Sequence, residues 1–252
     1  MILIGDLGNT HSKFSLYEYK KIKHIKSFET YKLLKKKKFI KFINNPKIKH
    51  VIVSSVVPKV FKELTFFFSR RGINCSEILN YKIKKLINIK VKKPKQVGSD
   101  RIANSIAAHR IYNSNCIIID FGTATTFDIL LKNGSYLGGL ITPGVKLALK
   151  NLNKFTAKLP LVKLKKTNQV IGKDTISAIN SGIYWGYIGM INEIVKKIIS
   201  STKKKYRVIL TGGLSNVFSK SLYCKSSVNK NITLLGVVEI VKHNMKFFKY
   251  EK

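Results

Sequence analysis

Apolar and polar residues alternate at the start of the chain in the pattern of a three-stranded antiparallel sheet. Residues 2–7 form an apolar run and residues 13–19 alternate with a period of two, so they predict two strands joined by a hairpin near Gly8–His11. A third strand is expected near residues 24–30. The apolar positions of residues 31–45 have a helical spacing among many lysines and predict a helix.

The pattern then predicts alternating strands and helices. In chain order the expected elements are a strand at residues 50–54, a helix at 58–71, a strand at 75–79 and a helix at 98–112. The Lys-rich segment 82–97 is expected to be irregular, because Pro94 is incompatible with a continuous helix. Ser99 or Asp100 is the expected N-cap of the helix that follows.

The same succession restarts in the second half of the chain. The expected elements are strands at 116–121, 125–131 and 135–141, helices at about 145–157 and 175–200, a strand at 206–210 and a closing helix at 235–248. Meander, helix, strand and helix thus occur twice, which predicts an α/β duplication with a cleft between its halves. The halves are placed at residues 1–114 and 115–252, and the C-terminal helix could pack back on the first.

Composition narrows the class of protein. A chain of 252 residues with 44% hydrophobic residues can bury a substantial core. No apolar run reaches the roughly 18 residues that span a bilayer, and Asp6 comes too early for a secretory signal, so neither a membrane nor a secreted location is expected. The three cysteines are far apart and fit neither a disulfide framework nor a zinc site, which favours the cytoplasm.

The net charge of +36 raises the question of nucleic-acid binding. Lysines are spread through every segment, and only five of the 48 basic residues are arginines, the residue type that suits base-edge and bidentate phosphate recognition. Lys, Ile and Asn all have A/T-rich codons, so a biased genome accounts for the pattern. We therefore expect no specific nucleic-acid partner.

Two similar turns carry the chemistry. Residues 2–10 end an apolar run in Asp6-Leu-Gly-Asn-Thr, and residues 117–126 end one in Asp120-Phe-Gly-Thr-Ala-Thr-Thr. Glycine lets the backbone approach an anion, amides and Thr hydroxyls donate to phosphate oxygens, and the carboxylate can hold the neutralising cation. The first turn alone could be an ordinary hairpin, since Gly-Asn is a favoured turn pair. Two such turns half a chain apart predict that both bind the same nucleotide.

Gly98-Ser-Asp-Arg101 is the candidate catalytic element. An Asp and an Arg at a helix start place a potential base beside a fixed cation and unsatisfied N–H groups. The alternative is a structural Asp cap with an Arg salt bridge. His11 and Lys13 are possible phosphate contacts, whereas neither a P-loop nor a GxGxxG motif is present to bind ATP in another way.

The motifs together resemble those of the type III pantothenate kinases, members of the superfamily of sugar kinases, actin and heat-shock chaperone ATPases. In chain order they are Asp6-x-Gly-Asn-Thr10, Ser54-Ser-Val-Val-Pro58, Gly98-x-Asp-Arg101, Asp120-Phe-Gly-Thr-Ala-Thr125, Gly138-Gly139 with Pro143-Gly144, Leu159-Pro160, Ile171-Gly172 with Thr175, Ser181-Gly182 and Thr211-Gly-Gly213. The resemblance spans nearly the whole chain. It implies duplicated ribonuclease H-like domains with a nucleotide cleft between them.

The resemblance also implies an activity: ATP-dependent phosphorylation of pantothenate to 4′-phosphopantothenate, the first step towards coenzyme A, in a homodimer that uses Mg²⁺ and K⁺ or NH₄⁺. Asp100 would be the base that takes the hydroxyl proton, and Asp120 would bind the monovalent cation. The ATP contacts would be Asp6, Leu7, Gly8, Asn9, Thr10, His11, Ser12, Lys13 and Thr123, with Asp6 near Mg²⁺ through the phosphates. The pantothenate contacts would be Gly98, Ser99, Asp100, Arg101 and Thr175.

One position departs from the family pattern. The family commonly has a substrate-contacting Tyr seven residues before Gly98, and this chain has Val91 there, within a basic stretch. A weaker affinity for pantothenate is therefore expected, with the catalytic elements intact. Two alternatives stay open: another small-molecule kinase on the same scaffold, and a non-catalytic nucleic-acid-binding regulator. The acidic turns argue against the regulator, because carboxylates repel a phosphate backbone unless a metal intervenes.

Overall fold

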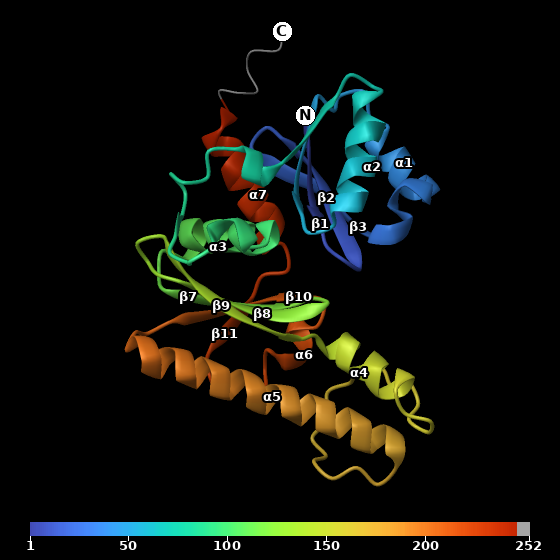
Figure 1. Ribbon diagram of the computed structural model, residues 1–252, viewed down its shortest axis with the longest axis vertical. Helices are drawn as coiled ribbons and strands as arrows, with labels where there is room; N and C mark the ends of the chain where they lie inside the picture. The colour runs from blue at the N-terminus through green and yellow to red at the C-terminus, as the bar shows by residue number, and fades with distance from the viewer. Residues whose placement is uncertain (246–252) are drawn as a thin grey trace. The chain divides into compact units, whose positions relative to one another are not determined.

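A five-stranded sheet is built from the first part of the chain in the computed structural model, which describes residues 1–245 (Figure 1). Its strands are β1 (Ile2–Leu7), β2 (His11–Glu18), β3 (Lys21–Glu29), β4 (His50–Ser55) and β5 (Asn74–Glu77), in the order β3-β2-β1-β4-β5. β1, β2 and β3 form an antiparallel meander, whereas β4 and β5 run parallel to β1. The predicted hairpin between the first two strands is confirmed, with Leu7 paired to Ser12.

The second sheet repeats this order. Its strands are β7 (Cys116–Phe121), β8 (Ala124–Leu130), β9 (Ser135–Pro143), β10 (Arg207–Gly212) and β11 (Ser226–Val228), with the short β6 (Asn88–Ile89) added at the β9 edge, in the order β11-β10-β7-β8-β9-β6. From the β9 side, the strands β9, β8 and β7 form the meander, and β10 and β11 then run parallel to β7. The first sheet has the same arrangement, with β4 and β5 parallel to β1. The duplication predicted from the sequence is therefore present in the topology.

The helices differ from the predictions mainly at their ends. They are α1 (Lys37–Ile43), α2 (Pro58–Ser69), α3 (Ser99–Tyr112), α4 (Val145–Lys154), α5 (Thr175–Thr202), α6 (Ser215–Phe218) and α7 (Ile232–His243). The single helix expected at 31–45 is wrong: a 3₁₀ helix at Thr30–Lys35 precedes α1, and Lys36 between them is extended. The last residues of the expected helix 235–248, 246–248, lie outside the described residues.

Among the described residues, three short elements have no counterpart in the sequence prediction, besides the 3₁₀ helices Ile78–Asn80 and Pro94–Gln96. They are α6, β11 and the two-residue strand β6 (Asn88–Ile89). β6 lies in the segment expected to be irregular and pairs in parallel with Ser135 and Tyr136 at the start of β9. Elements of two to four residues are too short to show a period, so pattern alone does not reveal them.

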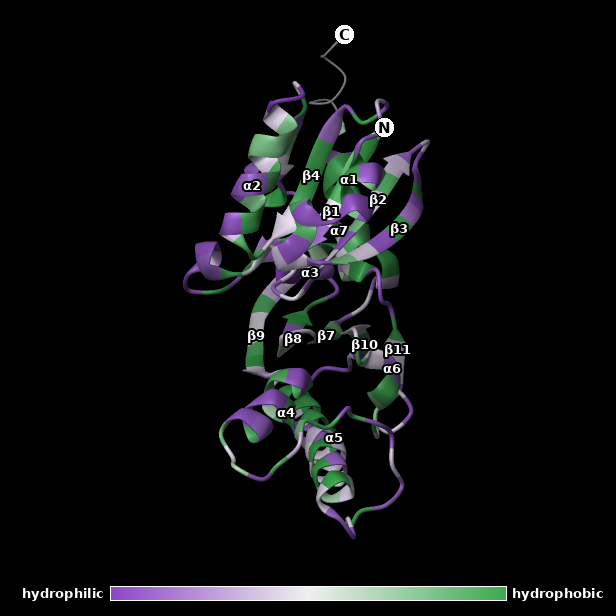
Figure 2. Ribbon diagram, turned by 90° about the vertical axis from the view of Figure 1, so that its right-hand side faces the viewer, coloured by the Kyte–Doolittle hydropathy of each residue, from purple (hydrophilic) through white to green (hydrophobic). Residues whose placement is uncertain are grey.

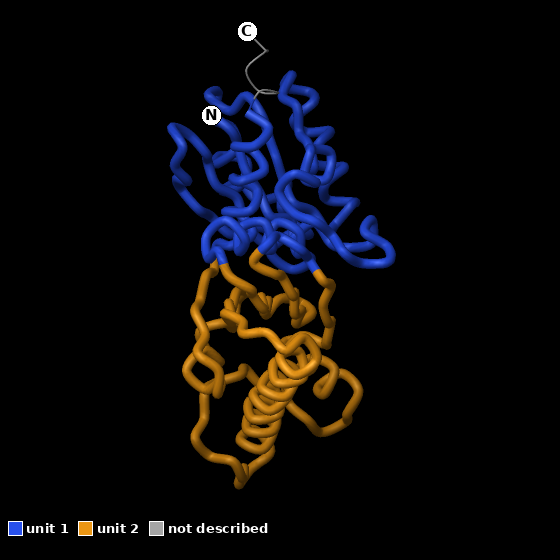
Figure 3. Tube along the Cα trace, turned by 90° about the vertical axis from the view of Figure 1, so that its left-hand side faces the viewer, with its two compact units in different colours: residues 1–113, 133–136, 231–252 blue, residues 114–132, 137–230 orange. Residues whose placement is uncertain are grey.

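The described chain divides into two compact units (Figure 3). Unit 1 consists of residues 1–113, 133–136 and the segment from Asn231 onward, and unit 2 of residues 114–132 and 137–230. Within unit 1, α7 packs against α3. The end of the chain thus completes the unit that the beginning of the chain forms.

Unit 1 has its own hydrophobic core between the sheet and helices α1 and α2. Leu3, Val51 and Val53 point from the strands, and Phe39 and Leu64 pack on them from the helices, all of them inaccessible to solvent. Hydrophobic residues run along β1 and β4, whereas hydrophilic ones dominate the outer strand β3 (Figure 2). Lysines on such an edge strand oppose edge-to-edge association.

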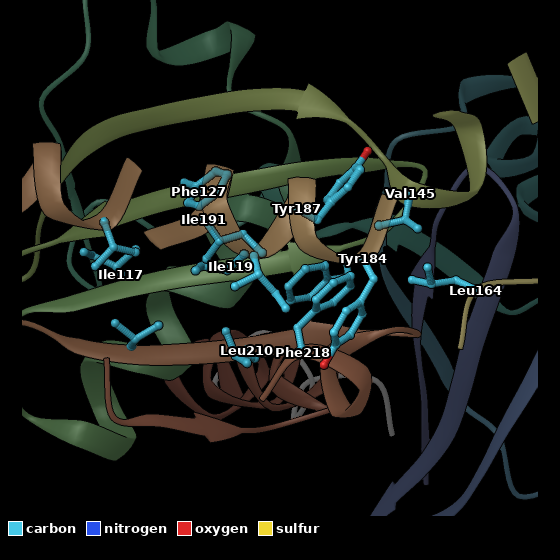
Figure 4. Close-up of a cluster of buried hydrophobic side chains, with 14 of the residues drawn as sticks. Ile117, Ile119, Phe127, Val145, Leu164, Tyr184, Tyr187, Ile191, Leu210 and Phe218 are labelled. Atoms are coloured by element: carbon cyan, nitrogen blue, oxygen red, sulfur yellow. The ribbon is translucent and has the colours of Figure 1, made fainter. Parts of the chain in front are cut away.

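Unit 2 packs α5 against one face of its sheet. Ile191 and Tyr187 of α5 meet Ile119 of β7, while Phe218 of α6 stacks on Tyr184 with ring centroids 5.9 Å apart (Figure 4). These contacts hold β7 and β10 in place, and both strands end at the second Gly- and Thr-rich turn. The hydrophobic core therefore fixes the position of that turn.

Close approach of α3 and α7 requires the glycine at position 236. A Cβ atom added there would lie 1.9 Å from the carbonyl oxygen of Ala103 in α3. We expect Gly236→Ala to lower the free energy of unfolding by about 1–3 kcal/mol, the usual cost of overpacking. Gly186 of α5 is the matched control, since its added Cβ meets nothing within 4 Å. Gly186→Ala should raise stability by about 0.5–1 kcal/mol, and equal effects in chemical denaturation would contradict this account.

Candidate active site

The first acidic turn lies at the carboxyl end of β1 in unit 1. Asp6 is half-buried and pairs with Lys13 of β2 on one side and with Ser54 of β4 on the other. Beyond it, Asn9, Thr10 and His11 are exposed at the tip of the hairpin. The turn thus presents backbone amides and hydroxyls to solvent beside one carboxylate, as expected for a phosphate-binding turn.

Thr30 holds this turn from behind. Its hydroxyl donates to the Gly8 carbonyl at 2.6 Å, its amide donates to the Thr10 carbonyl at 3.0 Å, and it shares a hydrogen bond with the buried Ser12 hydroxyl at 2.8 Å. A Cβ atom on Gly8 would lie 2.8 Å from the His11 carbonyl oxygen, so glycine is required for this turn. No sequence pattern pointed to Thr30, because its role depends on the pairing of β2 with β3.

Ser99 anchors the first turn of α3 to the end of β4. It is buried, and its Oγ accepts from the Ser55 amide at 2.8 Å and donates to the Ser55 carbonyl at 3.0 Å. The Ser54 hydroxyl lies 3.1 Å from the same oxygen. The prediction that Ser99 or Asp100 is the N-cap is wrong. Gly98 is the cap, and as a glycine it has no side chain to make a cap bond. The Ser99 hydroxyl bonds instead to Ser55 at the end of β4.

Asp100 follows directly and is largely desolvated. Burial raises the pKa of its carboxyl group, while the Arg101 amide, which donates to Oδ1 at 2.8 Å, and the Arg101 charge act in the opposite direction. A Cβ atom on Gly98 would lie 2.6 Å from that oxygen, so the backbone passes close to the carboxylate. A carboxyl group with a raised pKa at a helix start is suited to accept a proton.

Unit 1 therefore brings two of the predicted site elements together. Asp6 is paired with Ser54 in neighbouring strands, and the Ser54 hydroxyl contacts Ser99, the residue before Asp100. The first acidic turn and the candidate base are thus connected through the end of β4. Ser54 belongs to one of the motifs of the sequence analysis, but the sequence pattern predicted no role for it.

The second acidic turn lies in unit 2, at the carboxyl end of β7. Asp120 pairs with Thr126 of β8 and with Thr211 of β10, as Asp6 does with its two neighbours in unit 1. Gly122 and Thr123 are exposed beyond it. The Gly144 amide donates to the Thr123 carbonyl at 3.1 Å, and a Cβ atom on Gly144 would lie 2.2 Å from that oxygen.

Gly212 closes the other side of the second turn. Its φ of +83° is strained for any other residue, and an added Cβ would lie 2.6 Å from Asp120 Oδ1. We expect Gly212→Ala to displace the Asp120 carboxylate and to lower the melting temperature, because the added Cβ has no room and the backbone conformation is strained. Gly213→Ala is the matched control, because its Cβ meets nothing within 4 Å and should leave the melting temperature unchanged. A wild-type melting temperature in Gly212→Ala, measured by thermal denaturation, would show that the turn tolerates this displacement.

Thr175 lies apart from both turns in the sequence and begins α5. It is exposed, and the helix start is fixed by a capping box in which Asp174 accepts from the Ser177 amide at 3.0 Å. Hydrogen bonding to Ser177 lowers the pKa of the Asp174 carboxyl group. The structure thus gives Thr175 a well-defined position, and within residues 1–245 no hydrogen bond joins it to the other predicted site residues.

The donor groups suit cations that are bound together with phosphate. Mg²⁺ in nucleotide sites is held by one or two carboxylates, with phosphate oxygens and water completing the shell, and Asp6 beside an exposed amide-rich turn provides such a ligand. Among residues 1–245, no three acidic, His or Cys side chains gather as they would in an all-protein metal cage.

No helix of the described chain is long and apolar enough to cross a bilayer.

Solved structures of other proteins share this fold. The chain matches a conserved protein of the Baf transcriptional activator family from Campylobacter jejuni with a TM-score of 0.66 and 19% identity, over 97% of this chain and 99% of that one. It matches a protein from Sinorhizobium meliloti described as a 2-dehydro-3-deoxygalactonokinase with a TM-score of 0.59 and 8% identity, over 97% and 99%. The fold is the duplicated ribonuclease H-like α/β fold of sugar kinases and actin-like ATPases.

Sequence comparison gives the family. The model of type III pantothenate kinases matches residues 2–197. A curated type III pantothenate kinase from Pelagibacter ubique (strain HTCC1062) is 43% identical over 246 residues, which cover 94% of this chain and 97% of the relative. The chain belongs to the type III pantothenate kinase family, as the motifs of the sequence predicted.

Proposed function

We propose that this protein phosphorylates pantothenate with ATP to give 4′-phosphopantothenate, the first step of coenzyme A biosynthesis, with Asp100 as the general base. Membership of the family supports the reaction. The observation that supports the base is the position of Asp100: it is desolvated, starts a helix and is linked through Ser99 and Ser54 to the Asp6 turn.

Positioning accounts for most of the proposed catalysis. Phosphoryl transfer requires little covalent work from the protein, which must align the hydroxyl with the γ-phosphate and neutralise the charge that spreads over it. Asp100 orients the pantothenate hydroxyl and accepts its proton. Gly98, Ser99 and Arg101 shape the pantothenate site, and Thr175 adds a contact to the same substrate.

The two acidic turns bind the nucleotide and its cations in this proposal. Residues 6–13, from Asp6 to Lys13, hold the ATP phosphates with their amides, hydroxyls and the Lys13 ammonium, and Thr123 adds a contact from unit 2. Asp6 would hold Mg²⁺ and Asp120 would hold K⁺ or NH₄⁺. The chemistry that Mg²⁺ would supply at Asp6 is neutralisation of charge on the phosphate oxygens. The active protein is a homodimer in the cytoplasm, without a specific nucleic-acid partner.

Pantothenate-dependent ADP release in the presence of K⁺, NH₄⁺ or Na⁺ tests the cation assignment. We expect turnover to fall at least tenfold when Na⁺ replaces K⁺, because the smaller ion fits the Asp120 turn less well, and Asp120→Asn should abolish that difference. Equal rates with all three ions would remove Asp120 from this role. A panel of small alcohols in the same assay separates the proposal from another small-molecule kinase.

The nucleic-acid alternative is tested by DNA binding over a range of salt concentrations. A lysine-rich surface should give weak affinity that falls steeply with salt. Tight binding that persists at 0.2 M salt, in a protein without kinase activity, would favour a regulator.

A further inference from the structure

A cavity between α2 and the 3₁₀ helix Thr30–Lys35 has no part in the proposed mechanism. It has a volume of about 540 Å³, within the range of small-molecule binding pockets. All of its lining residues belong to unit 1, and none is among the predicted site residues. They are Leu34, Glu63, Phe66, Phe67, Arg70 and Arg71.

Two of the five arginines of the chain are adjacent in sequence at this cavity. Lysine supplies almost all of the other basic positions, so arginine at both places departs from the composition. The Arg71 guanidinium carbon lies 3.7 Å from the centre of the Phe67 ring, and that of Arg70 lies 5.8 Å from the centre of the Phe66 ring. Phe67 packs edge-on against the buried Phe68 at 5.3 Å, which holds the Arg71 stack in place.

These guanidinium groups keep their donors available for a ligand. A guanidinium stacked on a ring presents N–H groups at its edge, where they can bind a phosphate in bidentate geometry. Within residues 1–245, neither the Arg70 nor the Arg71 side chain forms an ion pair or a hydrogen bond. Because stacking already restrains Arg71, less conformational entropy is lost when an anion binds.

Phe66 and Glu63 offer two further kinds of contact. Phe66 is 64% exposed at the cavity, which leaves ring surface for a planar ligand to stack on. Glu63 is exposed and forms no ion pair with a described residue, so its oxygens can accept from hydroxyl groups. Acidic side chains bind ribose hydroxyls in this way in nucleotide sites. The same carboxylate repels a nucleic-acid backbone with a phosphate at every step.

We propose that this cavity is an accessory nucleotide site, which binds a nucleoside mono- or diphosphate apart from the catalytic site. The base stacks on Phe66, the ribose hydroxyls donate to Glu63, and the phosphate accepts from Arg70 and Arg71. A free phosphate, a carboxylate or a plain aromatic compound uses only part of this set of contacts. The inference does not rest on the proposed function, because no residue of the cavity takes part in phosphoryl transfer.

Equilibrium dialysis with ADP tests the accessory site. Wild-type protein is expected to bind one ADP per chain more than Arg70→Gln/Arg71→Gln, in which both charges and both guanidinium groups are lost. Lys59→Gln/Lys62→Gln is the matched control: it removes two charges from exposed positions of α2 that do not line the cavity, and should bind ADP as the wild type does. The kcat for pantothenate should be unchanged in both variants. Equal stoichiometry in wild type and Arg70→Gln/Arg71→Gln would overturn the proposal.

Photolabelling with 8-azido-ADP locates the site. Label is expected in the wild-type tryptic peptide 63–70, and its absence from this peptide would overturn the proposal. Phe66→Ala should keep the melting temperature and weaken ADP binding at this site about tenfold, the scale for loss of base stacking. Unchanged affinity in Phe66→Ala would remove the stacked base from the proposal.

Competition experiments define the class of ligand. Adenosine and inorganic phosphate should each displace ADP from this site far less effectively than AMP does, because each makes only part of the contacts. A single-stranded oligonucleotide that displaces ADP at lower concentration than AMP would overturn the proposal in favour of a nucleic-acid site. Absence of pantothenate-dependent ADP release would refute the proposed function and leave this inference standing, so the two failures are distinguishable.

Discussion

Asp100→Asn is expected to lower kcat by about 10²–10⁴-fold, the usual scale for loss of a general base. The Asn side chain keeps the size of Asp and the contact with the Arg101 amide, but it accepts no proton. Because the Asp6 turn is left intact, the affinity for ATP should be largely kept. Turnover and ATP binding can be measured on the same preparation, by ADP release and by calorimetry. Turnover near that of the wild type would remove Asp100 from the mechanism.

The raised pKa of Asp100 also predicts how activity and stability depend on pH in the wild type and in Asp100→Asn. The pKa of Asp100 is raised in the folded protein, so kcat/KM of the wild type should fall as pH drops through a value above that of an ordinary aspartate. Ionised Asp100 also costs folding stability at pH 7, and this cost disappears below the pKa of the unfolded chain. Asp100→Asn should therefore be at least as stable as the wild type at pH 7, with a difference that shrinks toward pH 4. A less stable variant would point to a structural role.

Asp6→Asn is expected to lower kcat/KM for ATP by about 10²–10³-fold, the scale for losing one preorganised charge-stabilising group. The asparagine can still fit between Lys13 and Ser54, but it is a weaker ligand for Mg²⁺ than a carboxylate. Part of the loss should be recovered at high Mg²⁺ concentration. A magnesium titration of turnover measures this shift, and an Asp6→Asn protein with the wild-type magnesium dependence would contradict the assignment.

Much of the fold followed from periodicity. Apolar runs that end in Asp6 and Asp120 predicted the first strand of each sheet, and their bounds are confirmed. The helix that begins at the Gly98–Arg101 motif was also placed correctly. Periodicity did not predict elements that form only through pairing with a distant segment. An example is β6, whose two residues form a strand because Ser135 and Tyr136 lie beside them.

The site was predictable in its residue types and less so in its connections. Motif resemblance identified the two acidic turns and Asp100, whose roles stay predictions. The sequence did not reveal that Thr30 supports the first turn or that Ser99 bonds to Ser55, because both relations arise from contacts between distant segments. The N-cap was assigned wrongly for the same reason, since the Ser99 hydroxyl bonds across to β4.

The most direct test is the product formed from ATP and pantothenate. Mass spectrometry of a reaction with wild-type protein, Mg²⁺ and K⁺ should show 4′-phosphopantothenate in a one-to-one ratio with ADP, and Asp100→Asn should form neither at a comparable rate. ADP release that is independent of pantothenate, or phosphorylation of another alcohol in its place, would contradict the account.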